Sequence, residues 1–370
     1  MPTEQFANNA QTTLAAAVPA AVAGAPGTIT VSAATGFPAG PQFRVRVGDE
    51  LMLVTAVAGT TWTVTRGIEG TAAAAHAAGD TVTQVLTAGA LAAVTALPHR
   101  PTGRLTTETG VVVSAADRTA QGTLFYTSGT AFLYDGAQFR PYTFGELTVP
   151  LSGLPAGTNY DVFLWDDGGT PALKIGPAWA DSGGGTSARG MATELEAVGG
   201  LWVNKAAVAG GPAARAGLYL GTVRTSGAGV TEDSRARRFV WNAWNQVPLP
   251  LLRRDSAASW TYMGGYRQAG AQAANQVEAV VGLAGAAADL SALVLSTLTG
   301  GASHVAIGAD SITPHPDGTG GQASSNATVD YRLCYRPAPG YHAWLWLEKA
   351  DTTNTFYGMG RFGLVGTLAG

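Results

Sequence analysis

Charged side chains are scarce in this sequence. Its 370 residues include 22 Lys and Arg and 25 Asp and Glu, so 13% of the chain is charged, against about a quarter in typical soluble proteins. The net charge is −3 and no long run of Lys or Arg occurs, so the charge pattern does not favour nucleic-acid binding. Two short basic groups, RARR at 235–238 and RR at 253–254, are interpreted as solvated faces, with phosphate binding as the alternative.

Cysteine and long apolar runs are also lacking. Cys334 is the only cysteine, which excludes an intramolecular disulfide and a cysteine-based metal cage. No apolar run is long enough to span a bilayer, and no charged segment followed by an apolar one marks a signal peptide. We therefore expect no membrane insertion, and synthesis and assembly in the cytosol.

Catalytic and cofactor motifs are missing as well. A P-loop, an H-E-x-x-H and a G-x-S-x-G do not occur, and GMGRFG at 358–363 is followed by only seven residues, too few for the helix that would hold a pyrophosphate. The five histidines stand apart from one another, at 76, 99, 304, 315 and 342. Acidic pairs occur at 166–167, 194/196 and 232–233, and we interpret the first as turn chemistry rather than a glycosidase pair. The sequence predicts no enzyme, no metal site and no cofactor.

Glycine and short alternating runs are what the sequence does contain. It has 50 glycines, and apolar residues alternate with polar ones between turn residues, as in half-buried strands. Residues 1–27 have few large apolar side chains and predict an extended arm that attaches to a partner. We expect an all-β chain with a β-rich module at 28–98 ending in a short helix over 87–97, a middle β-sandwich at 99–245 and a C-terminal, jelly-roll-like β-sandwich at 246–370.

Aromatic residues gather in two predicted strands of the last segment. In YHAWLWLEKAD (341–351), one strand face carries His342, Trp344 and Trp346 and the other carries leucines. If the leucines enter the core, the tryptophans are exposed and form an interface or a glycan-binding platform. The alternative buries the tryptophans in the core or between subunits. Trp260 and Tyr262 raise the same question.

The segment RGIEGTAAAAHAAGD (66–80) lies between two strand-like runs. No second histidine or nucleophile accompanies it, so we interpret it as a turn and not as a catalytic loop. Its glycines supply turn conformations. We expect Glu69 to accept hydrogen bonds from backbone amides or to pair with Arg66, and His76 to pack or donate locally.

This segment and the strands around it resemble the N-terminal module of many fibre and head-appendage proteins of tailed bacteriophages. The matching positions are Arg66, Gly67, Glu69, Gly70, Thr71, His76 and Gly79. Later blocks, including GTNYDVFLWDDGGTPALKIGPAW, are similar to segments of the same class, and the last 100 residues match only loosely.

The resemblance implies a structural virion protein, a homotrimeric tail or head fibre that is bound through its N-terminus to other capsid or tail proteins. Its C-terminal domain would serve host adhesion as a receptor-binding tip for a cell-surface glycan. A capsid-decoration or connector protein is the alternative, and a capsule depolymerase is less favoured because no β-helix repeat is visible.

Overall fold

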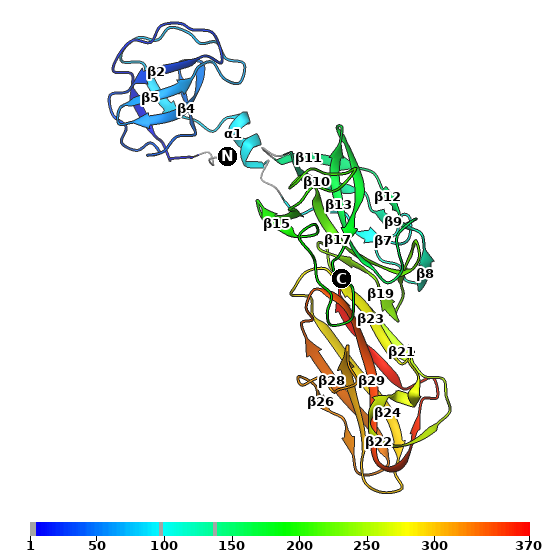
Figure 1. Cartoon of the computed structure of the whole chain (residues 1–370). Helices are drawn as coiled ribbons and strands as arrows, with labels where there is room; N and C mark the ends of the chain where they lie inside the picture. The colour runs from blue at the N-terminus through cyan, green and yellow to red at the C-terminus, as the bar shows by residue number, and fades with distance from the viewer. Residues whose placement is uncertain (1–4, 96–98, 136–138) are drawn as a thin grey trace. The chain divides into compact units, whose positions relative to one another are not determined.

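The computed structural model describes residues 5–95, 99–135 and 139–370. Strands make up 52% of the structure and helix 2%, which confirms the all-β prediction. The chain divides into two compact units, residues 1–97 and 98–370, which Figure 1 draws in blue to cyan and in cyan to red. The predicted first module ends at this division.

The first unit is a six-stranded antiparallel sheet in the order β1-β6-β3-β4-β5-β2. A bridge between Leu14 and Val31 joins the two edge strands, so the sheet closes on itself. Phe43 and Trp62, both fully buried, pack edge to face inside it. The elements are β1 (Gln11–Thr13), β2 (Pro26–Thr30), β3 (Phe43–Val47), β4 (Glu50–Ala58), β5 (Thr61–Thr65), β6 (Thr81–Gln84) and α1 (Ala88–Thr95).

The prediction of an extended arm over residues 1–27 is wrong for residues 5–27. Strand β1 and the start of β2 belong to the closed sheet, and Leu14 and Val18 are buried in its core. The segment is held in place with few large side chains, because its backbone N–H and C=O groups form hydrogen bonds to the sheet along its length.

The second unit begins with short strands around a core that includes Leu124, Val162 and Leu220. Its first elements are β7 (Leu105–Thr106), β8 (Arg118–Gln121), β9 (Thr123–Tyr126), β10 (Gly129–Tyr134), β11 (Phe139–Phe144), β12 (Leu147–Pro150), β13 (Asn159–Asp167), β14 (Thr170–Ala178), β15 (Leu195–Val198), β16 (Leu201–Asn204), β17 (Leu218–Gly227), β18 (Val230–Asp233), β19 (Arg237–Arg238) and β20 (Val240–Asn242).

Longer strands follow and enclose a second core, which contains Trp344, Trp346 and Phe356. These elements are β21 (Pro248–Arg254), β22 (Trp260–Gln268), the 3-10 turn η1 (Ala269–Ala271), β23 (Gln276–Val281), β24 (Ala288–Thr297), β25 (Ser303–Ala309), β26 (Thr319–Gly320), β27 (Gln322–Ala323), β28 (Ala327–Tyr335), β29 (Gly340–Tyr357) and β30 (Gly363–Ala369).

The predicted boundary at residues 245 and 246 does not separate compact units. Tyr219 and Trp241 come from the earlier part of the unit but pack in the core of the later strands. The Trp241 indole donates a hydrogen bond to the carbonyl of Ala369, and the Arg104 guanidinium donates one to that of Gly370. The two cores are separate clusters, and these contacts join the two parts of the unit across the boundary.

Gly282 permits the close approach between the two parts. A Cβ atom at this position would lie 2.1 Å from the hydroxyl oxygen of Tyr219 and 2.5 Å from Cε3 of Trp241. Both distances are far shorter than a van der Waals contact, and the two aromatic side chains are buried and unable to move aside.

We expect Gly282→Ala to lower the free energy of unfolding of the second unit by about 1–3 kcal/mol, because a methyl group overpacks the junction. Gly145→Ala is the matched control, since a Cβ there meets nothing within 4 Å. Urea denaturation followed by tryptophan fluorescence measures both variants. Equal stability of the two would contradict a close-packed junction.

Candidate functional site

A buried carboxylate contacts the segment 66–80 in the first unit. Glu50, the first residue of β4, is fully buried at its side chain. Arg66 donates to both of its oxygens, from Nε to Oε1 at 2.6 Å and from Nη2 to Oε2 at 2.7 Å. His76 Nε2 lies 2.7 Å from Oε2, and the Gly67 amide donates to Oε1 at 2.9 Å. We call Glu50, Arg66 and His76 the Glu50 cluster.

The Glu50 cluster ties the N-terminal segment to the sheet. Arg66 also donates hydrogen bonds to the carbonyls of Pro19 and Ala74. The backbones of Val18 and His76 exchange two hydrogen bonds of 2.9 Å each. One guanidinium group thus joins β4 to two segments that precede and follow it in the chain.

The environment of Glu50 keeps its side chain ionised. Burial by itself raises the pKa of the carboxyl group, but hydrogen bonds from Arg66 and His76, the charge of Arg66 and the Gly67 amide outweigh burial and hold the pKa below its usual 4.5. Removing one partner of such a buried ion pair strongly destabilises the folded protein, because the other charge stays buried without a partner.

Glu69 performs a different role from Glu50. Its carboxylate accepts hydrogen bonds from the Thr87 hydroxyl at 2.5 Å and the Gly89 amide at 2.9 Å, and it pairs with Arg44 at 2.9 Å. The predicted bond from a backbone amide is therefore confirmed, whereas the alternative pairing with Arg66 is wrong. Glu69 holds the first turn of α1.

The remaining residues of the segment shape its turns. Gly67 has a φ of +59°, and a Cβ there would lie 2.9 Å from the Thr71 carbonyl. The Thr71 hydroxyl donates to the Ile68 carbonyl and accepts from the Leu51 amide. Gly70 and Gly79 also have positive φ. Of the predicted residues, the structure thus brings Arg66, Gly67 and His76 together around Glu50. Glu50 itself was not predicted, because one acid at the start of a strand forms no motif.

Of the two placements left open for the tryptophans of β29, the structure has the buried one. Trp344 and Trp346 are 0% exposed and lie in the core of their own chain. His342 is also buried, between the Asp310 carboxylate and the Ala338 carbonyl, each at 2.8 Å. The alternation of faces was predicted correctly, but the tryptophan face points inward. Because Trp344 and Trp346 have no exposed area, they form no aromatic platform on the surface of this chain.

Trp260 and Tyr262 of β22 are only half-buried. The Trp260 indole donates to Glu348 Oε2 at 2.6 Å, and Arg267 donates to Oε1 of the same carboxylate at 2.9 Å. Its ring packs against Trp346 and Phe356. Trp260 is consequently held in one orientation.

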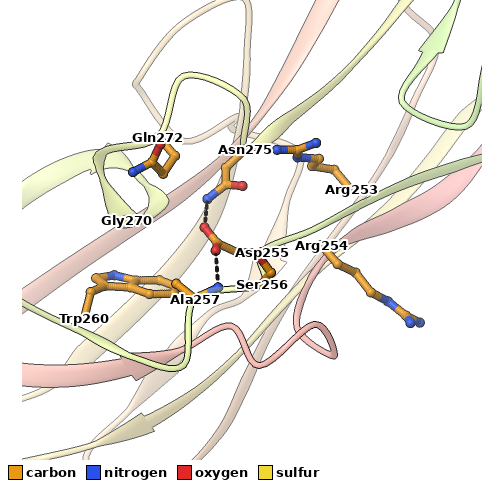
Figure 2. A pocket seen from close by; sticks show the side chains of 9 residues that line it. All are labelled: Arg253, Arg254, Asp255, Ser256, Ala257, Trp260, Gly270, Gln272 and Asn275. Carbon is orange, nitrogen blue, oxygen red and sulfur yellow. Dashed lines mark hydrogen bonds between the residues drawn. The ribbon is translucent and has the colours of Figure 1, made fainter. Parts of the chain in front are cut away.

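Trp260 lines an open hollow of about 440 Å³, shown in Figure 2. Asp255 lies in its wall and accepts hydrogen bonds from Asn275 Nδ2 at 2.6 Å and from the Ala257 amide at 2.8 Å. The lining residues are Arg253, Arg254, Asp255, Ser256, Ala257, Trp260, Gly270, Gln272 and Asn275. The arrangement offers polar groups beside an aromatic ring, which is suited to binding rather than to catalysis.

In comparisons with known proteins, no family model, no curated protein and no solved structure matches the chain. Within residues 5–95, 99–135 and 139–370, no group of three or more His, Cys, Asp or Glu side chains could hold a metal ion. No helix in the same ranges is long and apolar enough to cross a membrane.

We expect Glu50→Gln to destabilise the first unit by about 3 kcal/mol, because the Arg66 charge loses its buried partner. Asp49→Asn is the matched control, a neighbouring exposed acid with the same change of charge. Hydrogen exchange of residues 11–84 in the full chain, read by mass spectrometry, measures both. Equal protection in the two variants would contradict a structural role for the cluster.

The Glu50 cluster also predicts a dependence on pH. A carboxyl group whose pKa is lower in the folded state adds stability above its unfolded-state pKa, and this stability is lost as the pH falls through the folded-state value. We therefore expect protection of residues 11–84 to fall below about pH 4.5, and to fall less in Glu50→Gln. If the unmodified protein and Glu50→Gln lose protection equally as the pH falls, the acid sensitivity belongs to other carboxylates, such as Glu69.

Proposed function

We propose that the chain is a structural virion protein of a tailed phage, a homotrimeric fibre or spike with jelly-roll-like sandwich domains. The first unit attaches to the particle and the second meets the host surface. The observation that carries this proposal is the Glu50 cluster. The residues that resemble the phage module make their contacts inside the first unit, as expected for a self-contained attachment domain. Attachment then belongs to this folded unit and not to an extended arm.

Contacts between subunits would explain one feature of the composition and one of the surface. Charge is scarce, and several large apolar side chains of the second unit are exposed, among them Met191 at 87%, Met263 at 60% and Ile312 at 58%. Apolar surface of this kind is favourable when it is buried between copies. These features support a trimer.

Contacts of the acidic pairs favour a structural role over a capsule depolymerase. Asp166 accepts hydrogen bonds from the Tyr142 hydroxyl and from the Gly169 amide in the turn after β13. The other pairs are engaged with basic side chains: Glu194 with Lys205, Glu196 with Arg215, Glu232 with Arg237, and Asp233 with Arg238. A glycosidase needs two carboxylates that face a sugar across a groove.

The hollow beside Trp260 favours host contact over a capsid-decoration or connector role. A connector would bind another virion protein through the second unit and needs no oriented aromatic ring beside polar side chains. A glycan uses both, through stacking on the ring and hydrogen bonds to hydroxyl groups.

Native mass spectrometry of the full chain tests the assembly. We expect a species of three times the chain mass of 37.6 kDa at micromolar concentration. Gold-labelled antibody should also mark fibres or spikes on purified particles, and the protein should adhere to host cells. A monomer that is absent from particles would contradict the proposal, whereas a particle-bound trimer that ignores host cells would favour the connector.

A further inference from the structure

A second hollow adjoins the one beside Trp260. Its volume is about 470 Å³ and Arg253 lines both hollows. The segment 272–276 contributes Gln272 and Asn275 to the first hollow and the intervening alanines and Gln276 to the second. The lining residues of the second hollow are Glu232, Ala236, Arg237, Arg253, Ala273, Ala274, Gln276 and Glu278. Two subsites therefore lie on either side of one short segment.

Arg253 is not neutralised by an ion pair, although the Asp255 carboxylate, which also forms no ion pair with the described residues, lines the first hollow beside it. In the second hollow, Glu232 and Glu278 both pair with Arg237, at 3.4 and 3.3 Å. Neither Arg253 nor Arg254 forms an ion pair with any residue that the structure describes. The Arg253 Nε–H is moreover buried without a hydrogen-bond partner in the same part of the chain. A guanidinium group in this setting favours an anion, which accepts its planar set of donors.

Asn275 adds a second unsatisfied polar group. Its side chain is 1% exposed and its Nδ2 donates to Asp255 and to the Ala269 carbonyl. Its Oδ1 is buried and accepts no hydrogen bond from the described residues. An unsatisfied buried acceptor is unfavourable, and Asn275 lines the first hollow.

Trp260 supplies an oriented aromatic wall. Glu348, which fixes the indole, is itself held by Arg267 and by the Gly270 amide at 3.1 Å. Because the indole N–H is already bonded to Glu348, the ring contributes its apolar surface to the hollow. The C–H face of a sugar ring packs against such a surface while its hydroxyl groups bond to neighbouring polar side chains.

We propose that the two hollows are adjacent subsites for an acidic polysaccharide. One sugar packs on Trp260 with its hydroxyl groups on Asp255 and Gln272, and the anionic group of the glycan binds Arg253 between the subsites. Arg254 also lines the first hollow and adds a second positive charge there, beside the negative charge of Asp255. The proposal rests on the host-contacting role proposed above and specifies the chemical class of the receptor.

Isothermal titration of the full chain with paired oligosaccharides tests the ligand class. The probes are hexuronate and sialic-acid oligosaccharides with their carboxyl-reduced counterparts, and a sulfated oligosaccharide with its desulfated counterpart. We expect at least one acidic probe to bind ten-fold or more tightly than its neutral partner, with affinity that falls as salt rises. The pairs that respond distinguish carboxylate from sulfate. No binding to any probe, or equal binding within every pair, would overturn the proposal.

Arg253→Gln tests the site. We expect it to weaken binding of the acidic probe at least ten-fold and to leave the thermal unfolding of the chain unchanged, because the side chain has no partner to lose. Arg332→Gln is the matched control, an exposed arginine of β28 outside both hollows, and should stay within two-fold of the unmodified protein. Equal affinities in the two variants would overturn the assignment.

Adhesion to host cells separates this inference from the proposed function. If Arg253→Gln adheres as well as the unmodified trimer, the hollows are not the receptor site and the fibre role stands. If the unmodified chain neither forms a trimer nor adheres, the fibre role itself fails.

Discussion

The first unit depends on the ion pair between Glu50 and Arg66. Burying one carboxylate without a partner costs several kcal/mol, so the pair is stable only because the Gly67 amide and His76 complete the hydrogen bonds around Glu50. Arg66 in turn reaches Pro19 and fixes a segment that has few large apolar side chains of its own. One polar centre thereby replaces part of the hydrophobic packing that closes the sheet.

The second unit uses its few charges in the same way, at the junction of its two cores. Arg189 pairs with the buried Asp161 at 2.7 Å. Arg224 lies 3.7 Å from the centre of the Tyr341 ring, whose hydroxyl donates to Glu278. Because these charged side chains interact with partners inside the fold, they add little to the charge of the surface.

Local patterns in the sequence predicted most of the strands. Alternating runs between turn residues are found as expected: a turn at 58–61 joins β4 and β5, the Gly199–Gly200 pair joins β15 and β16, and the alanine-rich stretch 269–298 contains β23 and β24 after the turn η1. Period-2 alternation predicts which residues share a face but not which face is inside, so the sequence left both placements of Trp344 and Trp346 open. The partner of Arg66 was missed for a related reason, since it depends on how distant segments close around Glu50.

A double-mutant cycle between Glu50→Gln and Arg66→Gln tests the central claim most directly. The free energy of opening of residues 11–25 is measured by hydrogen exchange in the full chain. If the two side chains stabilise the unit as a pair, the double variant loses about 2 kcal/mol less than the sum of the single variants. Additive losses, within about 0.5 kcal/mol, would contradict the claim that this pair holds the N-terminal segment in the sheet.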